Sequence, residues 1–159
     1  MTTKNTDLVA NFEASPQVAN SAAELAGVLR TAHGSVELAA GDSTDDDIVM
    51  LAPIPSNAAV PTLFIGSDTF GGSCTFNVGI YTSAGVVKDE DVFATSVADA
   101  AAMADVRYEA ADLNTGSQKL RELAGDTSDP GGYYYIAITF NATGGTAGTL
   151  NWNISYVVD

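Results

Sequence analysis

The sequence predicts an all-β fold, an antiparallel β-sandwich of jelly-roll-like type with about eight strands, one or two short helices and an extended N-terminal arm. Apolar and polar residues alternate with period two in several short stretches. Clusters of glycine and aspartate separate these stretches, whereas helical periodicity is scarce. With 159 residues the chain has the length of one domain. We divide it into an N-terminal arm, residues 1–24, and a sandwich, residues 25–159.

The N-terminal arm is polar and alanine-rich, and its few apolar residues follow neither the helical nor the strand period. These residues, Leu8, Val9, Phe12 and Val18, are too few to form a core of their own. The arm is therefore either a frayed end of the chain or a segment that becomes ordered against a partner surface. In the second case the four apolar residues are the predicted contacts with a capsid or a subunit.

Four stretches of the sandwich have one apolar and one polar face, as expected of strands with one buried side. The stretch Ile48–Ala52 is instead apolar on both faces, which predicts either a central strand or a covered outer face, and another chain could provide that cover. The predicted core contains Phe76, Val78, Ile80, Ile136, Ile138, Phe140, Trp152 and Ile154. The four apolar faces are Val36, Leu38 and Ala40; Cys74, Phe76, Val78 and Ile80; Tyr134, Ile136, Ile138 and Phe140; and Leu150, Trp152, Ile154, Tyr156 and Val158.

Two segments are helix candidates. Residues 115–125 place Leu120 and Leu123 on one face and end at Gly125, a residue that commonly stops a helix. Residues 97–103 are alanine-rich, with Ser96 placed to cap the first turn. Turn chemistry at residues 41–47, 66–72, 83–85, 126–132 and 142–148 separates the strands between them.

The charge is strongly acidic, with 20 acidic and six basic residues and a formal net charge of −14. Nucleic-acid binding requires clustered Lys and Arg, and here the basic residues are scattered singly, so a nucleic-acid partner is not expected. No apolar run reaches the roughly 20 residues that cross a bilayer, and the first residues do not resemble a secretion signal. The single cysteine, Cys74, lies in a strand pattern and is interpreted as a small buried hydrophobe. We therefore expect synthesis in a reducing cytoplasm and no membrane partner.

Residues able to carry chemistry are few. His33 is the only histidine, and its place before a glycine is more typical of a turn than of a catalytic site. No phosphate-binding loop and no other cofactor pattern is present in the sequence, so we expect neither an enzyme nor a bound cofactor. The aspartates of residues 42–47 could ligate calcium through Asp42, Asp45, Asp46 and Asp47, although a solvated turn is the favoured interpretation.

Three consecutive tyrosines form the other unusual cluster. A strand sends Tyr134 to one face and Tyr133 and Tyr135 to the opposite face. The outward pair could stack on sugars, but contact with a capsid or a subunit is the favoured interpretation.

Several motifs in order along residues 25–97 resemble a known family. They are A-x-L-x-G-V-L-R ending at Arg30, G-S-V-E-L-A-A-G-D ending at Asp42, I-P-S-N-A-A-V starting at Ile54, and V-G-I-Y-T-S-A-G-V-V-K-D-E-D-V-F-A starting at Val78. This order resembles the capsid decoration, or cement, proteins of tailed bacteriophages. The resemblance implies a sandwich that binds the outer surface of the assembled shell in the virion, with the major capsid protein and its own copies, commonly as a homotrimer, as partners. It implies that the function is to stabilise the capsid.

A second class of function remains open from the residues themselves. A β-sandwich can also serve as a carbohydrate-binding or receptor-binding module of a phage fibre or a secreted enzyme. Exposed coplanar aromatic residues beside polar hydrogen-bonding groups would favour this second function, whereas an apolar, flat base that carries the N-terminal arm would favour decoration.

Overall fold

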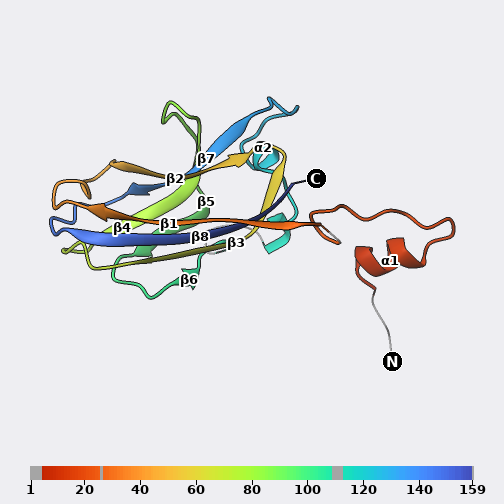
Figure 1. Cartoon of the computed structure of the whole chain (residues 1–159), viewed down its shortest axis with the longest axis horizontal. Helices are drawn as coiled ribbons and strands as arrows, with labels where there is room; N and C mark the ends of the chain where they lie inside the picture. The colour runs from red at the N-terminus through yellow and green to blue at the C-terminus, as the bar shows by residue number, and fades with distance from the viewer. Residues whose placement is uncertain (1–4, 26, 109–112, 159) are drawn as a thin grey trace.

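The computed structural model describes residues 5–25, 27–108 and 113–158. Its strands form two antiparallel four-stranded sheets that pack face to face (Figure 1). Sheet 1 has the order β1-β8-β3-β6 and sheet 2 the order β2-β7-β4-β5. The strands are β1 (Leu29–Leu38), β2 (Ile48–Pro55), β3 (Ala58–Ser67), β4 (Thr75–Tyr81), β5 (Val87–Ala98), β6 (Ala104–Asp105), β7 (Tyr133–Phe140) and β8 (Gly148–Val158).

This strand order confirms the predicted jelly-roll-like sandwich. Successive strands change sheet at every step except β4 to β5, and the first and last strands pair in sheet 1. A jelly roll arranges eight strands in two sheets in this way, through two Greek keys. β1 and β2 are consequently the unpaired edge strands on one side of the sandwich.

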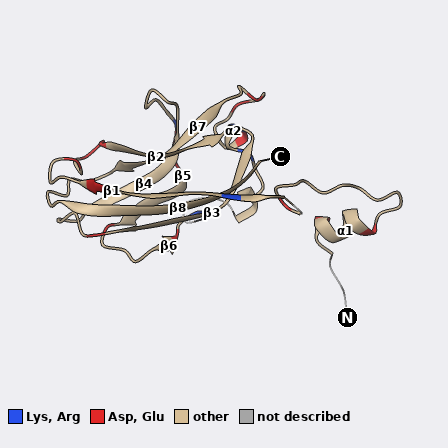
Figure 2. Ribbon diagram, in the orientation of Figure 1, with Lys and Arg blue, Asp and Glu red and all other residues tan. Residues whose placement is uncertain are grey.

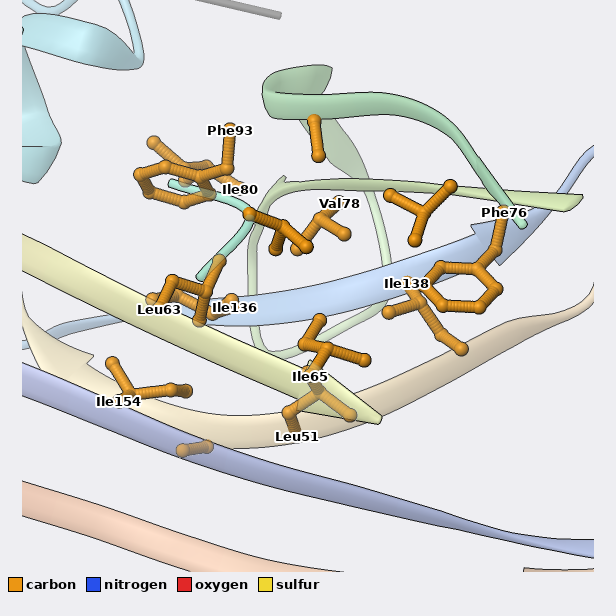
Figure 3. Close-up of a cluster of buried hydrophobic side chains, with 14 of the residues drawn as sticks. Leu51, Leu63, Ile65, Phe76, Val78, Ile80, Phe93, Ile136, Ile138 and Ile154 are labelled. Atoms are coloured by element: carbon orange, nitrogen blue, oxygen red, sulfur yellow. The ribbon is translucent and has the colours of Figure 1, made fainter. Parts of the chain in front are cut away.

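The core fills the space between the sheets (Figure 3). Seven of the eight predicted core residues are at most 1% exposed: Phe76, Val78, Ile80, Ile136, Ile138, Phe140 and Ile154. Phe140 makes edge-to-face contacts with Phe70 and Phe76, with ring centroids 5.6 and 6.1 Å apart. Such pairs add to the free energy already gained by burying the rings.

Trp152 differs from the prediction because it is only partly buried against this core. It pairs with Gly34 of the edge strand β1. Its ring occupies the space that a side chain at Gly34 would take, since a Cβ there would lie 2.7 Å from Cζ2 of the indole. A residue that packs at the rim of a sandwich keeps part of its surface in water.

The stretch Ile48–Ala52 forms most of β2, which is an edge strand, so the prediction of a central strand was wrong. A register shift between Met50 and Ala52 explains its pattern, because the irregularity leaves both Leu51 and Ala52 buried. Ile48 at the start of the strand is 42% exposed. The strict alternation of buried and exposed residues therefore fails at the bulge between Met50 and Ala52.

The helix predicted over residues 97–103 was also wrong, because β5 continues to Ala98. Val97 pairs with Phe76, and Ser96 has a positive φ of 54° and donates its N–H to Oδ1 of Asn77 at 2.9 Å. The backbone N–H and C=O groups of this segment thus pair with β4 rather than with one another in a helix. His33, interpreted as a turn residue, lies inside β1 and pairs with Asn153.

The helix predicted over residues 115–125 is confirmed in a shorter form. α2 spans Leu120–Leu123, and Gly125, with φ of 78°, follows it. Leu120 is its buried residue, and Lys119 before it donates its N–H to the Glu122 carboxylate at 3.0 Å. A short 3-10 helix, η1 (Leu113–Thr115), precedes α2.

β5 bends over the outer face of sheet 2. Val78 and Ile80 of β4 pair with Ala94 and Asp89 of β5, so β5 contains an insertion at this point. The inserted chain lies on Gly79, where a Cβ would be only 2.2 Å from the carbonyl oxygen of Asp89. The outer face of sheet 2 is therefore covered, and residues there such as Tyr81 are buried.

Candidate functional site

The N-terminal arm projects away from the sandwich (Figure 1). It contains α1 (Asp7–Glu13), in which no residue is buried. The segment after the helix turns back along it, because Asn11 donates its side-chain N–H to Oδ1 of Asn20 at 2.8 Å and Asn20 donates to the carbonyl of Leu8 at 3.2 Å. We name residues 5–20 the hook. The sequence period predicted no helix here, since four scattered apolar residues do not make a helical stripe.

The hook exposes the apolar residues that were predicted as contacts. Val9 is 41%, Phe12 64% and Val18 51% exposed, and Leu8 is partly buried. Water contact of this much apolar surface is unfavourable, by about 25 cal/mol for each Å² that could be buried. The hook therefore presents a surface suited to contact with another macromolecule.

The root of the arm is closely packed. Gly27 lies between the arm and the end of β8, where a Cβ would be 1.9 Å from the carbonyl oxygen of Ala22 and 2.5 Å from Cγ1 of Val157. This contact explains why Val157, which does not share the apolar face predicted for the last strand, is only 6% exposed. Because Gly27 has no side chain, the arm can pack this closely against the end of β8 where it leaves the sandwich.

The two predicted tyrosine contacts lie elsewhere. They are on β7, which belongs to sheet 2, whereas the arm continues into β1 of sheet 1. Tyr133 is 61% exposed and Tyr135 partly buried, while Tyr134 between them is 6% exposed and donates to the Asp126 carboxylate. The predicted division of the tyrosines between two faces is confirmed, but the structure does not join them and the hook into one patch.

The end of the sandwich opposite the arm, here the far end, consists of loops 39–47, 68–74, 99–103 and 141–147. Backbone bonds tie these loops together: Gly144 donates to Ser43 at 2.7 Å, and Thr146 donates to Phe70 at 2.7 Å. Six aspartates and no Lys or Arg occur in the four loops (Figure 2). The aspartates are Asp42, Asp45, Asp46, Asp47, Asp68 and Asp99.

The calcium alternative finds no support in these loops. Within the residues that the structure describes, no three acidic, histidine or cysteine side chains are grouped to hold a metal ion. Asp42 accepts a hydrogen bond from the N–H of Ala39 at 2.8 Å, and Asp47 accepts from the N–H and the hydroxyl of Thr44. The hydroxyl bond is the main cause that lowers the pKa of Asp47. These aspartates act as turn residues.

Cys74 is buried, as predicted, and has a free thiol. Burial raises the pKa of the Cys74 thiol, which keeps it protonated and unreactive at neutral pH. No helix within the described ranges is long and apolar enough to span a bilayer.

The chain is similar to a solved structure from a virus. It is a chain described as cyanophage Pam1 capsid asymmetric unit, with 16% identity and a TM-score of 0.44 over 84% of this chain and 86% of that one. No family model and no curated protein matches. Likeness at this level does not assign the chain to a family.

Proposed function

We propose that this protein is a non-enzymatic structural component of a bacteriophage virion that binds the outer surface of the assembled capsid and stabilises it. Two features support the proposal: the motif order in residues 25–97 and the exposed apolar residues of the hook. The second carries it, because Phe12 is 64% exposed on a segment that projects from the sandwich. A segment of this kind gains its stabilisation from a partner surface.

The stabilising effect follows from linkage. A protein that binds assembled capsid subunits, but not dissociated ones, shifts the equilibrium against disassembly. Many identical contacts repeated over a symmetric shell strengthen this effect by multivalency. The proposed partners are the major capsid protein and two further copies of this chain.

The homotrimer is part of the same proposal. The edge strands β1 and β2 lie on one side of the sandwich, and exposed apolar residues occur on both, Leu29 at 58% and Ile48 at 42%. Packing these edges around a three-fold axis would cover both residues. Cross-linking on decorated shells should give a trimer band, and a band pattern of monomers alone would contradict the trimer.

Co-sedimentation with undecorated capsids tests the capsid-binding function. We expect the wild-type protein to sediment with the shells and to raise the temperature at which they release their contents. Phe12→Ser should lower the bound fraction without changing the melting temperature of the free protein. Leu113→Ser is the matched control, because Leu113 is 82% exposed but lies outside the hook. Equal loss of binding in both variants, or binding unaffected by Phe12→Ser, would count against the role of the hook.

A further inference from the structure

The outer faces of the two sheets differ. The outer face of sheet 2 lies under the inserted chain of β5, as the close approach of Asp89 to Gly79 shows. The outer face of sheet 1 is open, since even Asn151 and Asn153 of the interior strand β8 are exposed. An interior strand that presents exposed side chains at its middle marks a flat, accessible surface.

Polar side chains are arranged in rows on this open face. Strand pairing places His33, Asn153 and Phe64 in one row across β1, β8 and β3. The next row consists of Ser35, Asn151 and Gly66. Neighbouring strands lie about 4.8 Å apart, so a row across three strands spans about 10 Å.

A depression of about 340 Å³ lies over these rows, lined by His33, Gly34, Ser35, Met103, Asn151, Trp152 and Asn153. Its wall on the β3 side depends on Gly66, because the backbone of Met103 passes over that residue. A Cβ at Gly66 would be 2.8 Å from the Met103 nitrogen. The Met103 side chain is 48% exposed.

The polar groups of this depression are unused within the protein. In the part of the chain that the structure describes, the side chains of His33, Ser35, Asn151 and Asn153 have no hydrogen-bond partner. The Asn141 side chain, in contrast, donates to Asn77 at 2.7 Å. The face therefore offers amide, hydroxyl and imidazole groups to a ligand.

The depression is also free of ionic side chains. No Lys, Arg, Asp or Glu lines it, although the chain carries a formal charge of −14. Two acids outside the lining accept hydrogen bonds within the protein: Glu37 from the hydroxyl of Thr149 at 2.6 Å, and Asp105 from the N–H of Leu63 at 3.1 Å. An anionic ligand would lack a cation here, and a metal ion would lack a carboxylate, so the fitting ligand is neutral.

We propose that this depression binds an uncharged oligosaccharide. The amides of Asn151 and Asn153 can each donate to one hydroxyl of a sugar and accept from the next. Phe64, 36% exposed on β3 beside Asn153 and outside the lining of the depression, offers an aromatic surface to the apolar face of a second sugar ring. Asn151 and Asn153 lie on the interior strand β8, whose backbone is paired on both sides, so a ligand over them meets side chains, and this favours a saccharide over an extended peptide.

Titration of the ¹⁵N-labelled protein with neutral oligosaccharides tests the proposal. The probes are lactose, cellotetraose, maltotetraose and an N-acetylglucosamine tetramer, with sialyllactose as the charged comparator. We expect at least one neutral probe to give saturable shifts of the Asn151 and Asn153 side-chain amides, and sialyllactose to bind more weakly than lactose. Asn153→Ala should weaken binding about tenfold, the equivalent of one lost hydrogen bond.

Asn114→Ala is the matched control, because Asn114 is exposed but lies on η1, outside this face. It should leave the titration unchanged. Saturable shifts from no neutral probe, or binding that Asn153→Ala leaves intact, would overturn the proposal. If Asn153→Ala instead lowers the amount of protein bound to capsids while no sugar binds, this face is a capsid contact and the saccharide site is refuted. Loss of capsid binding in Phe12→Ser tests the hook separately.

Discussion

Nε of Arg107 donates a hydrogen bond of 2.7 Å to the carbonyl oxygen of Val60, and this bond fastens the loop after β6 to β3. The side chain is fully buried. Its other nitrogens donate to Thr115, at 3.0 Å to the carbonyl and 3.3 Å to the hydroxyl. The guanidinium lies 4.9 and 5.0 Å from the ring centres of Phe93 and Tyr108. One cation thus links β3, the residues directly after β6, and η1.

Replacing this cation should be costly. Arg107→Met removes the donor to the buried carbonyl of Val60 together with both hydrogen bonds to Thr115, so the free energy of unfolding should fall by about 3 kcal/mol. Urea denaturation followed by tryptophan fluorescence measures the change. Arg30→Met, at an exposed position of β1, should change it by less than about 0.5 kcal/mol. Equal stability of the Arg107 variant and the wild-type protein would show that the contacts are not stabilising.

A methyl group on Gly79 should displace the inserted chain of β5. The new Cβ would lie 2.2 Å from the carbonyl oxygen of Asp89, and backbone cannot yield as a flexible side chain does. We expect Gly79→Ala to lower the free energy of unfolding by about 1 to 3 kcal/mol. Gly41→Ala is the matched control, because nothing lies within 4 Å of its Cβ position. If both variants are equally stable, β5 does not press on sheet 2.

Asp129 should make stability sensitive to acid. The Ser56 hydroxyl, 2.6 Å from its carboxylate, and the Gly131 N–H hold the pKa of Asp129 below the ordinary 3.8. A carboxyl whose pKa is lowered on folding stabilises the protein above pH 3.8, and this contribution is lost as the pH falls through the lowered value. In Ser56→Ala the pKa should rise toward 3.8, as measured by ¹³C titration of the carboxyl. An unchanged Asp129 titration in this variant would contradict the assigned cause.

Deleting residues 2–20 separates folding from binding. The described hydrogen bonds of the hook stay within the hook, as those of Asn11 and Asn20 do, so the sandwich loses none of them. We expect an unchanged thermal midpoint and weaker retention on capsids. A truncated protein that decorates shells at wild-type occupancy would refute the role of the arm.

Period two predicted the sandwich well where strands are regular. Phe76 and Ile138 are buried as expected, since alternation alone decides which face of a regular strand enters the core. The pattern failed where the backbone departs from ideal pairing. The bulge beside Leu51 and the insertion of β5 opposite Gly79 have no period of their own, so their strand positions could not be predicted from the sequence.

The candidate sites were harder to predict than the fold. Val9, Phe12 and Val18 were singled out because they are apolar in a polar segment, and all three are exposed. The open face of sheet 1 escaped prediction, because Asn151 and Asn153 were assigned only to the wet side of a strand. Their row with His33 depends on pairing between chain segments over a hundred residues apart, which one sequence does not show.

On a decorated shell, the six aspartates of the far end would act on the whole particle. If the arm end contacts the shell, these loops face outward on every copy, and the bonds between them hold the charges in place. Each coated particle would then carry a dense negative outer layer, and neighbouring particles in suspension would repel one another. At physiological salt this repulsion acts only within about 8 Å of the surface, the screening length there. Decoration would thus act as a colloidal stabiliser, keeping crowded virions dispersed in dilute buffer and letting them cluster in strong brine or acid.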